Sequence, residues 1–403
     1  MHLSNYSSAK ERQMSNIKAA MIGWGHTKFG KHTDTSLDNL ISQVITEAVV
    51  HAGIDYSEID EVFLAHFNAG FSEQDFTSSL VLQHKNMSRF LPITRVENAC
   101  ATGSAAMQAG AYAIEAKRAK TVLVVGVEKM THLPNRDVGQ ILGRASYVAE
   151  EEKFGSFVGV FGHIANQYVE KYGDINNDLA NIAVKNHANG MKNPLAHLQK
   201  AVTFDYCVNE SDVNPVIVSP LKRSDCSLVS DGAAAVILKG SDNLAEAKRA
   251  VSIKAMAHVN DYLPMSRRNM TQLEGCQQAW QQVLKKAKLS IWDLDLVESH
   301  DCFTIAELMQ YEAMGLTEFG QGHKALAEGW VYADGKLPVN VSGGLKSKGH
   351  PIGASGVSMH VMAAKQLSDE AGDMQLNNAN QAGVFNMGGT GVANYVSILE
   401  RTK

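Results

Sequence analysis

The sequence has few cysteines and no long apolar run. Its five cysteines are odd in number, widely spaced and form no CxxC pair, which argues against a disulfide framework or a zinc site and favours a reducing compartment. No apolar stretch approaches the roughly 18 residues of a membrane span, and residues 1–16 lack the apolar core of a secretory signal. We therefore expect a cytoplasmic protein without a membrane span or a bound metal, in which residues 1–16 form an N-terminal extension.

The sequence also lacks a large excess of either charge. The formal net charge is −5 and no long basic run is present, which argues against nucleic acid as a partner. The chain is 403 residues long, 45% of them hydrophobic and 20% charged. This is ordinary composition for a globular protein, and a chain of this length buries roughly three quarters of its unfolded surface. A disordered, collagen-like or disulfide-scaffold protein is thereby excluded.

Short apolar runs alternate with longer helical patterns along most of the chain. In the helical patterns, apolar residues recur at a spacing of three or four. This rhythm predicts an α/β fold with a parallel or mixed sheet. The predicted strands of the first part lie at residues 18–25, 62–65, 93–97 and 121–127, and the predicted helices at 36–53 and 101–119.

The stretch from about residue 128 to 218 interrupts this rhythm. It contains loop-like pieces and two helical patterns, at 160–172 and 177–191. A small-residue strand then follows at 231–238, and the rhythm restarts near residue 252 as though a second copy begins. We therefore predict two similar halves, 17–250 and 251–403, with a loop domain inserted into the first.

Cys100 is the first candidate for chemistry. It follows the predicted strand at 93–97, stands at the start of the predicted helix at 101–119, and has small neighbours. A helix N-terminus presents unpaired amides and the positive end of the helix dipole, so we expect a lowered pKa for this thiol. The alternative is a buried cysteine that acts as a small hydrophobic residue.

His350 is a candidate partner for this cysteine. It lies in the glycine-densest segment of the chain, after a predicted strand at 337–341, and Pro351 beside it suits the first position of a helix. An imidazole there could take the proton of a cysteine thiol. The alternative is a turn histidine that is hydrogen-bonded to the backbone.

A third cluster, His300, Asp301 and Cys302, follows a predicted strand at 295–298. A histidine and a cysteine this close in sequence can share a cavity, where one donates hydrogen bonds and the other moves protons. We expect Asp301 to cap the helix that follows. The alternative for the whole cluster is a helix-capping turn without chemistry.

Residues 386–391, with the sequence N-M-G-G-T-G, have the glycine density of a loop whose backbone amides approach a ligand. The pattern is neither the GxGxxG of a dinucleotide site nor a P-loop, because no GK[ST] follows. The alternative is a tight turn before the last strand.

Together, these segments resemble the thiolase family, and the resemblance covers nearly the whole chain. Cys100 in N-A-C-A-T-G-S is similar to the family's acyl-accepting cysteine, and His350 in G-H-P-I-G-A is similar to its histidine motif. The D-G-A-A-A run that begins at Asp231 resembles the segment after the loop domain. In this alignment, Ser227 falls on a serine that contacts the pantetheine arm.

The chain departs from ordinary thiolases in two places. They carry N-E-A-F where this chain has H-D-C-F, and they carry a C-x-G motif where this chain has Phe385 at the cysteine and Met387 at the glycine. Both departures resemble the sterol-carrier-protein-type thiolases and their bacterial relatives. In those enzymes the cysteine of H-D-C-F does the work of the missing one.

The resemblance implies a duplicated βαβαβαββ fold in five layers, αβαβα, with the loop domain inserted into the first half. It implies a homodimer or homotetramer. It also implies that acetyl-CoA, other acyl-CoA thioesters and free CoA are substrates, with no permanently bound cofactor. Lys185, Lys222 and Arg223 are candidates for binding the CoA phosphates.

The implied activity is that of an acyltransferase that makes or cleaves 3-ketoacyl-CoA through an acyl-enzyme on Cys100. His350 would take the thiol proton and Cys302 would move the α-proton of acetyl-CoA. His300 and His350 would donate to one oxyanion, and the backbone amides of Cys100 and Gly388 would hold the other. The alternatives are a ketosynthase-like decarboxylating enzyme and a non-catalytic subunit of a multi-protein acyltransferase complex.

Overall fold

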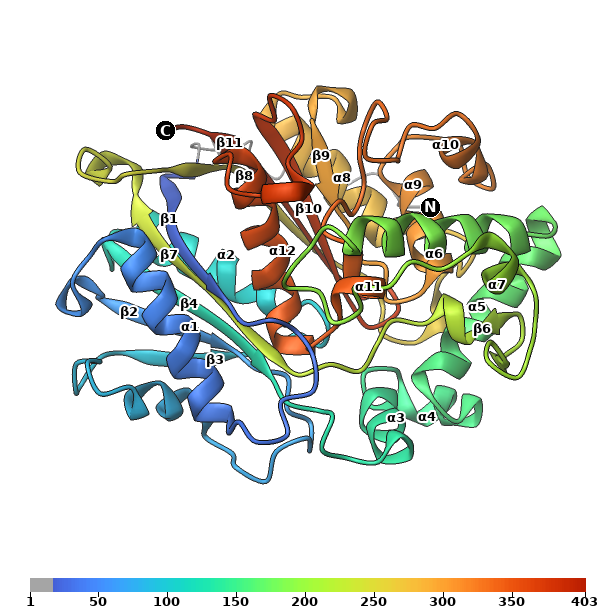
Figure 1. Ribbon diagram of the computed structural model, residues 1–403, viewed down its shortest axis with the longest axis horizontal. Helices are drawn as coiled ribbons and strands as arrows, with labels where there is room; N and C mark the ends of the chain where they lie inside the picture. The colour runs from blue at the N-terminus through green and yellow to red at the C-terminus, as the bar shows by residue number, and fades with distance from the viewer. Residues whose placement is uncertain (1–16) are drawn as a thin grey trace, which may run out of the picture.

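The computed structural model describes residues 17–403, and the N-terminal extension expected at residues 1–16 lies outside them. The first half of the chain alternates strands and helices as predicted (Figure 1). Its strands are β1 (Ala19–His26), β2 (Glu61–Ala65), β3 (Ile93–Val96), β4 (Thr121–Glu128) and β7 (Gly232–Gly240), and its helices are α1 (Leu37–Ala52) and α2 (Thr102–Glu115).

Helix α1 shows how local sequence sets these boundaries. The Ser36 side chain accepts a hydrogen bond from the backbone N–H of Asn39 at the N-terminus. Gly53 adopts the left-handed conformation that ends the helix, with φ of 69°. Apolar residues at helical spacing between these caps are buried against the sheet, as the pattern predicts.

The excursion between β4 and β7 is mainly helical and lies to one side of the sheet in Figure 1. Two of its helices coincide with the helical patterns of the sequence. Its elements are α3 (Asn135–Gly143), α4 (Val148–Glu151), α5 (Phe157–Tyr172), α6 (Asn176–Gly190), α7 (Phe204–Val208) and the small two-stranded sheet of β5 (Val216–Val218) and β6 (Leu221–Lys222).

The second half repeats the alternation of the first. Its strands are β8 (Val251–Asn260), β9 (Leu296–Glu298), β10 (Gln381–Gly388) and β11 (Ala393–Arg401), and its helices are α8 (Glu274–Ala287), α9 (Thr304–Ala313), α10 (His323–Ala327), α11 (Gly344–Lys348) and α12 (Ile352–Leu367).

The strand order demonstrates the duplication. Nine strands form one mixed sheet in the order β3-β2-β4-β7-β1-β8-β11-β10-β9. If the strands are counted within each half, the first half has the order third, second, fourth, fifth, first. The second half has the same order in reverse, with an isolated bridge between Val297 and Val339 in the place of its third strand. The predicted duplicated fold is therefore confirmed.

The strand predicted at 337–341 is wrong, because this segment contributes only that bridge. Asn340 has a φ of 59°, in the left-handed region, which interrupts the extended backbone that a strand requires. Its side chain is used instead as a brace, since its Oδ1 accepts from the backbone N–H of Ser299 at 2.8 Å.

Helices α2 and α12 pack against each other between the two halves of the sheet. Helix α1 covers the outer face of the first half, and α8 covers the outer face of the second. These contacts give five layers, αβαβα. Cys100 lies two residues before α2 and His350 two residues before α12, so the packing of these helices brings the two side chains to one place.

The crossing of α2 and α12 depends on glycine. A Cβ on Gly103 would lie 2.6 Å from the backbone nitrogen of Val357 and 2.7 Å from the Cα of Gly356. The two backbones are therefore in direct contact, closer than any side chain would allow.

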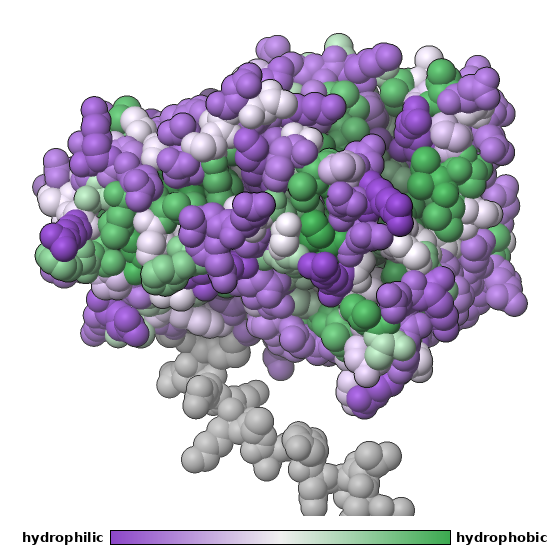
Figure 2. Space-filling model, turned by 90° about the horizontal axis from the view of Figure 1, so that it is seen from below, coloured by the Kyte–Doolittle hydropathy of each residue, from purple (hydrophilic) through white to green (hydrophobic). Residues whose placement is uncertain are grey.

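No helix among residues 17–403 is long and apolar enough to cross a membrane. Figure 2 shows a face of the molecule on which apolar side chains form separate patches divided by hydrophilic ones. Scattered apolar side chains of this kind are normal on a globular protein.

Substitution of Gly103 tests the helix crossing. Gly103→Ala should lower the free energy of unfolding by about 1–3 kcal/mol, because an overpacked interior must shift to accept the new methyl group. Gly139→Ala in α3 is the matched control, since its Cβ would meet nothing within 4 Å. The control should gain up to about 1 kcal/mol. Denaturant unfolding that finds Gly103→Ala as stable as the unsubstituted protein would contradict the close contact.

Candidate active site

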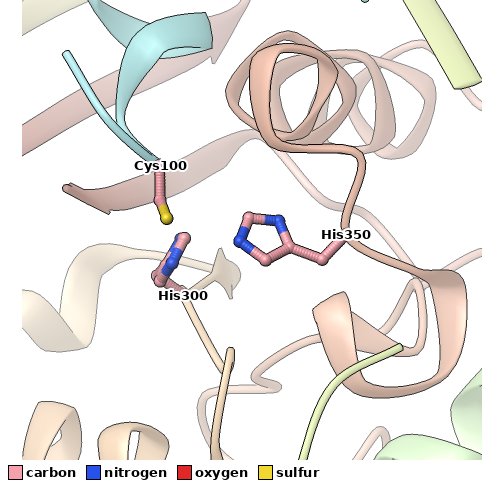
Figure 3. A group of neighbouring side chains, drawn as sticks. All are labelled: Cys100, His300 and His350. Atoms are coloured by element: carbon pink, nitrogen blue, oxygen red, sulfur yellow. The ribbon is translucent and has the colours of Figure 1, made fainter. Parts of the chain in front are cut away.

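Cys100 lies in a sharp turn between β3 and α2. Ala99 before it has a φ of 50°, which is strained for a residue with a side chain. Thr102 holds the turn, since its hydroxyl donates to the carbonyl of Ala99 at 2.6 Å and accepts from the backbone N–H of Asn98 at 2.8 Å. The thiol points toward His300 and His350, which belong to the second half (Figure 3).

The expected lowering of the Cys100 pKa is wrong. Burial raises the pKa of this thiol to about 12, and a hydrogen bond from the backbone of Gly389 opposes the rise only in part. Desolvation disfavours the thiolate more strongly than the start of α2 favours it. The carboxylates of Glu128 and Glu97 raise the pKa further. At neutral pH, the resting side chain is a protonated thiol.

His350 presents an unprotonated nitrogen to this thiol. Its Nδ1 lies 2.6 Å from the hydroxyl of Ser355, and that hydroxyl donates its proton to the carbonyl of Pro351 at 2.8 Å. Ser355 must then accept from Nδ1–H, which leaves Nε2 with a free lone pair. Burial, together with the charge of Lys348, lowers the pKa of His350 to about 3. His350 is therefore a neutral base at neutral pH.

His300 presents a proton instead. Its Nδ1 lies 3.0 Å from the Nδ2 amide nitrogen of Asn386, which can only donate. The proton of the neutral ring must therefore be on Nε2. Burial and the neighbouring His350 hold the pKa of His300 well below its usual range. Gln310 clamps its backbone, accepting from its N–H at 2.9 Å and donating to its carbonyl at 2.7 Å.

The three side chains converge on one point (Figure 3). A sulfur of Cys100 and one ring nitrogen of each histidine all lie within 4.8 Å of one another. The two rings meet edge to face, with centroids 5.1 Å apart. Neither histidine Nε2 has a hydrogen-bond partner among residues 17–403. Buried polar atoms without a partner are costly, so this point is suited to a polar group that arrives with a ligand.

Cys302 lies close enough to Cys100 for the charge of one thiol to affect the pKa of the other. It is buried, and burial holds its pKa well above the usual value, with the Cys100 thiol raising it further. Its backbone carbonyl accepts from the N–H of Ser227 at 2.9 Å. Ser227 therefore lies beside this segment, and its contact with the pantetheine arm, which the resemblance implies, stays a prediction.

Asp301 is a helix cap, but of a different helix from the one expected. Its carboxylate accepts from the backbone N–H groups of Leu345 at 2.6 Å and Lys346 at 3.1 Å, at the start of α11. It therefore caps α11 and not α9, because the chain folds back over this carboxylate. Burial and the nearby Glu307 raise its pKa to about 7. This contact ties the His300 segment to the segment that leads into His350.

The sequence places Phe385 at the cysteine position of the C-x-G motif, but in the structure the next residue, Asn386, faces the site. Phe385 is buried on the α8 side of β10, with its ring 6.5 Å from that of Trp280. Side chains alternate between the faces of a strand, so Asn386 points to the other face and reaches His300. Asn386 is thus the residue of β10 that enters the site, and Gly388, not Met387, follows two positions later.

A cavity of about 510 Å³ opens beside the turn that carries Cys100. Asn98, Ala99, Gly388 and Gly389 are among the residues that line it. A molecule in this cavity can therefore contact the backbone just before Cys100 and the backbone at the end of β10.

The structure distinguishes the three residues that were candidates for binding the CoA phosphates. Lys185 is wrong as a candidate, because it is buried and forms an ion pair with Glu307 at 2.9 Å. Lys222 is also buried, and its Nζ donates to Asn176 at 2.5 Å. Arg223 is exposed and keeps its place as a candidate.

Comparisons with known proteins agree with this geometry. The family model described as "Thiolase, N-terminal domain" matches residues 17–242, and the one described as "Thiolase C-terminal domain-like" matches residues 257–401. The chain is 36% identical to an acetyl-CoA acetyltransferase of Methanothermobacter thermautotrophicus, over 95% of this chain and 99% of that protein. It is 31% identical to sterol carrier protein 2 of Gallus gallus, over 91% of this chain and 69% of that protein.

A solved structure shares the fold. Human mitochondrial 3-ketoacyl-CoA thiolase in complex with CoA superposes with a TM-score of 0.75 at 17% identity, and the match covers 97% of this chain and 100% of that chain. At this identity the likeness concerns the fold alone. The family matches cover both halves of the chain, and the thiolase family uses CoA thioesters as substrates. The chain therefore belongs to the thiolase family and is a thiolase-type acyltransferase.

Proposed function

We propose that the protein makes or cleaves 3-ketoacyl-CoA, including acetoacetyl-CoA, through an acyl group carried on Cys100. The observation that carries this proposal is the pair of histidines in opposite tautomers beside one buried thiol. His350 offers a lone pair and His300 offers a proton. Acyl transfer needs both a base for the nucleophile and a donor for the oxygen that becomes negative.

Acylation begins with the thiol of Cys100 and the Nε2 of His350. The sulfur attacks the thioester carbon while its proton passes to His350, and the same proton then leaves with the CoA sulfur. Because burial disfavours a free thiolate, attack and proton transfer are coupled. The backbone N–H groups of Cys100 and Gly388 are the proposed donors to the oxyanion, and donors of this kind are worth roughly 3–4 kcal/mol each.

Carbon–carbon bond formation uses the other two groups. Cys302 first gives its thiol proton to the Nε2 of His350, and the resulting thiolate removes the α-proton of acetyl-CoA. His300 and the now protonated His350 donate to the oxygen of the resulting enolate. The enolate carbon attacks the acyl group on Cys100, which releases the Cys100 sulfur, and this sulfur recovers its proton from His350. In the cleavage direction, Cys302 returns the proton. The position of Cys302 in the same low-dielectric space as Cys100 supports this role.

Substrate contacts outside the reacting centre are assigned to two residues. Ser227 contacts the pantetheine arm, supported by its place beside the Cys302 backbone. Arg223 contacts the CoA phosphates. No cofactor is bound permanently in this scheme, and no metal takes part.

The alternatives are less well supported. A ketosynthase-like enzyme generates its carbanion by decarboxylation and has no use for an acid–base cysteine such as Cys302. A non-catalytic subunit has no need to keep Cys100, His300, Cys302 and His350 together in one buried site.

We further propose that the protein is a cytoplasmic homodimer or homotetramer with its halves divided near residue 250. Strand β3 is one of the two edges of the large sheet, and Phe90 just before it is 84% exposed. An edge strand with exposed apolar neighbours is suited to pairing with a second copy. Sedimentation at micromolar concentration should find at least the mass of two chains, and a monomer would contradict the proposal.

Two cysteine substitutions separate the half-reactions. Cys100→Ala should abolish acyl-enzyme formation from acetyl-CoA, as intact-mass measurement would show. Cys302→Ala should still acylate Cys100, because acylation needs no α-proton transfer. It should lose thiolysis and α-proton exchange of acetyl-CoA in deuterated water by about 10²–10⁴-fold.

The control is Cys276→Ala, in a helix that lies outside the site, which should leave both half-reactions intact. Exchange at the unsubstituted rate in Cys302→Ala would show that another group moves the proton. An acyl group found on Cys100→Ala would show that Cys100 is not the nucleophile.

The pH dependence of acylation tests the state of His350. Its lowered pKa of about 3 means that the base stays neutral far below the usual histidine range. The acylation rate, measured by rapid quench, should therefore show no fall on acidification between about pH 7.5 and 5.5. A half-maximal step near the ordinary histidine pKa, about 6.5, would contradict the account.

A further inference from the structure

Asn386 contacts two parts of the site at once. Its Nδ2 donates to the backbone carbonyl of Cys100 at 3.0 Å and to the Nδ1 of His300 at 3.0 Å. It lies on β10, a strand buried within the sheet, and is fully buried. One amide nitrogen therefore joins the nucleophile's backbone to the imidazole that faces it.

The orientation of this amide is determined by its surroundings. A flipped amide would place Oδ1 against the carbonyl oxygen of Cys100, where two acceptors would repel each other. In the present orientation, Oδ1 faces Gly356 in α12, 2.3 Å from where a Cβ on that residue would lie, and has no hydrogen-bond partner among residues 17–403. The donor face of Asn386 is thereby directed at His300.

We propose that Asn386 is a positioning residue that keeps the proton of His300 on Nε2. A neutral imidazole in water places its proton on either nitrogen. Here the two N–H bonds of Nδ2 are directed at the Cys100 carbonyl and the His300 ring, so a proton on Nδ1 would meet another donor. Asn386 thus makes His300 a hydrogen-bond donor, while Ser355 makes His350 an acceptor.

This assignment separates the site from a metal site of the same composition. One sulfur and two imidazole nitrogens within 4.8 Å are the ligands that a soft divalent cation such as Zn²⁺ takes. A metal needs a lone pair on each nitrogen, and metal-bound histidines donate their other N–H to a carboxylate or carbonyl. Asn386 presents a donor where such a site has an acceptor, and so the Nε2 lone pair of His300 is withheld.

Asn386→Asp reverses the preference, because a carboxylate accepts Nδ1–H and frees Nε2. The experiment has two readouts, of which only activity rests on the proposed function. Calorimetric titration with Zn²⁺ should find affinity on the order of tenfold higher than in the unsubstituted protein, the range attributed to partners of metal-bound histidines. This binding should vanish in the Cys100→Ala, Asn386→Asp double variant.

The activity readout follows from the lost donor. Asn386→Asp should slow thiolysis and α-proton exchange by about 10²–10³-fold, the usual effect of removing one oxyanion donor. Acylation of Cys100 should change far less, since its proposed oxyanion donors are backbone amides. If the unsubstituted protein itself forms no acyl-enzyme, the proposed function fails, while the zinc titration still tests Asn386.

Two control variants separate positioning from general destabilisation. Asn394→Asp alters another buried asparagine, on β11, whose Nδ2 donates to the carbonyl of Gly391 at 2.8 Å and whose Oδ1 also has no partner among residues 17–403. It should leave zinc affinity unchanged. Asn386→Leu removes both hydrogen bonds without offering an acceptor, and should gain less zinc affinity than Asn386→Asp. Unchanged zinc affinity in folded Asn386→Asp would overturn the proposal, whatever its activity.

Discussion

The contact between α2 and α12 is the constraint on which the site depends. Each helix begins two residues after a reactive side chain, Cys100 or His350. The helices meet through Gly103 and Gly356, where the backbones touch without intervening side chains. Because the two halves share one strand order, this contact places equivalent turns of the duplicated fold opposite each other.

Burial then decides the chemistry of the groups that meet there. It holds the Cys100 thiol protonated and both histidines neutral, so the resting site has no thiolate–imidazolium ion pair. Hydrogen bonds, not charges, distinguish the two histidines. Ser355 and Asn386 give them opposite tautomers, so that one ring can accept a proton while the other donates to oxygen. Charge appears only when substrate arrives, and the groups that will stabilise it are already in place.

The sequence predicted most of the strands and helices, because local patterns and turn chemistry carry this information. The meeting of Cys100, His300 and His350 was implied by the resemblance to the thiolase family. What the sequence missed depends on tertiary contacts. The left-handed backbone of Asn340 removed a predicted strand, and the burial of Lys185 against Glu307 removed a phosphate-binding candidate. The thiol pKa was predicted from the helix terminus alone, without its desolvation. The motif alignment on β10 was off by one residue. It assigned Phe385 to the site, whereas Asn386 faces it, because neighbouring strand residues point to opposite faces of the sheet.

The central claim is that acyl groups pass through a covalent bond to the thiol of Cys100. The most direct test is to mix the unsubstituted protein with acetoacetyl-CoA and free CoA, quench the reaction during turnover, and map the modified peptides by mass spectrometry. The account predicts an acetyl group on the peptide that contains Cys100, which appears and decays at the rate of turnover. An acetyl group on another residue, or turnover without any modified peptide, would contradict it.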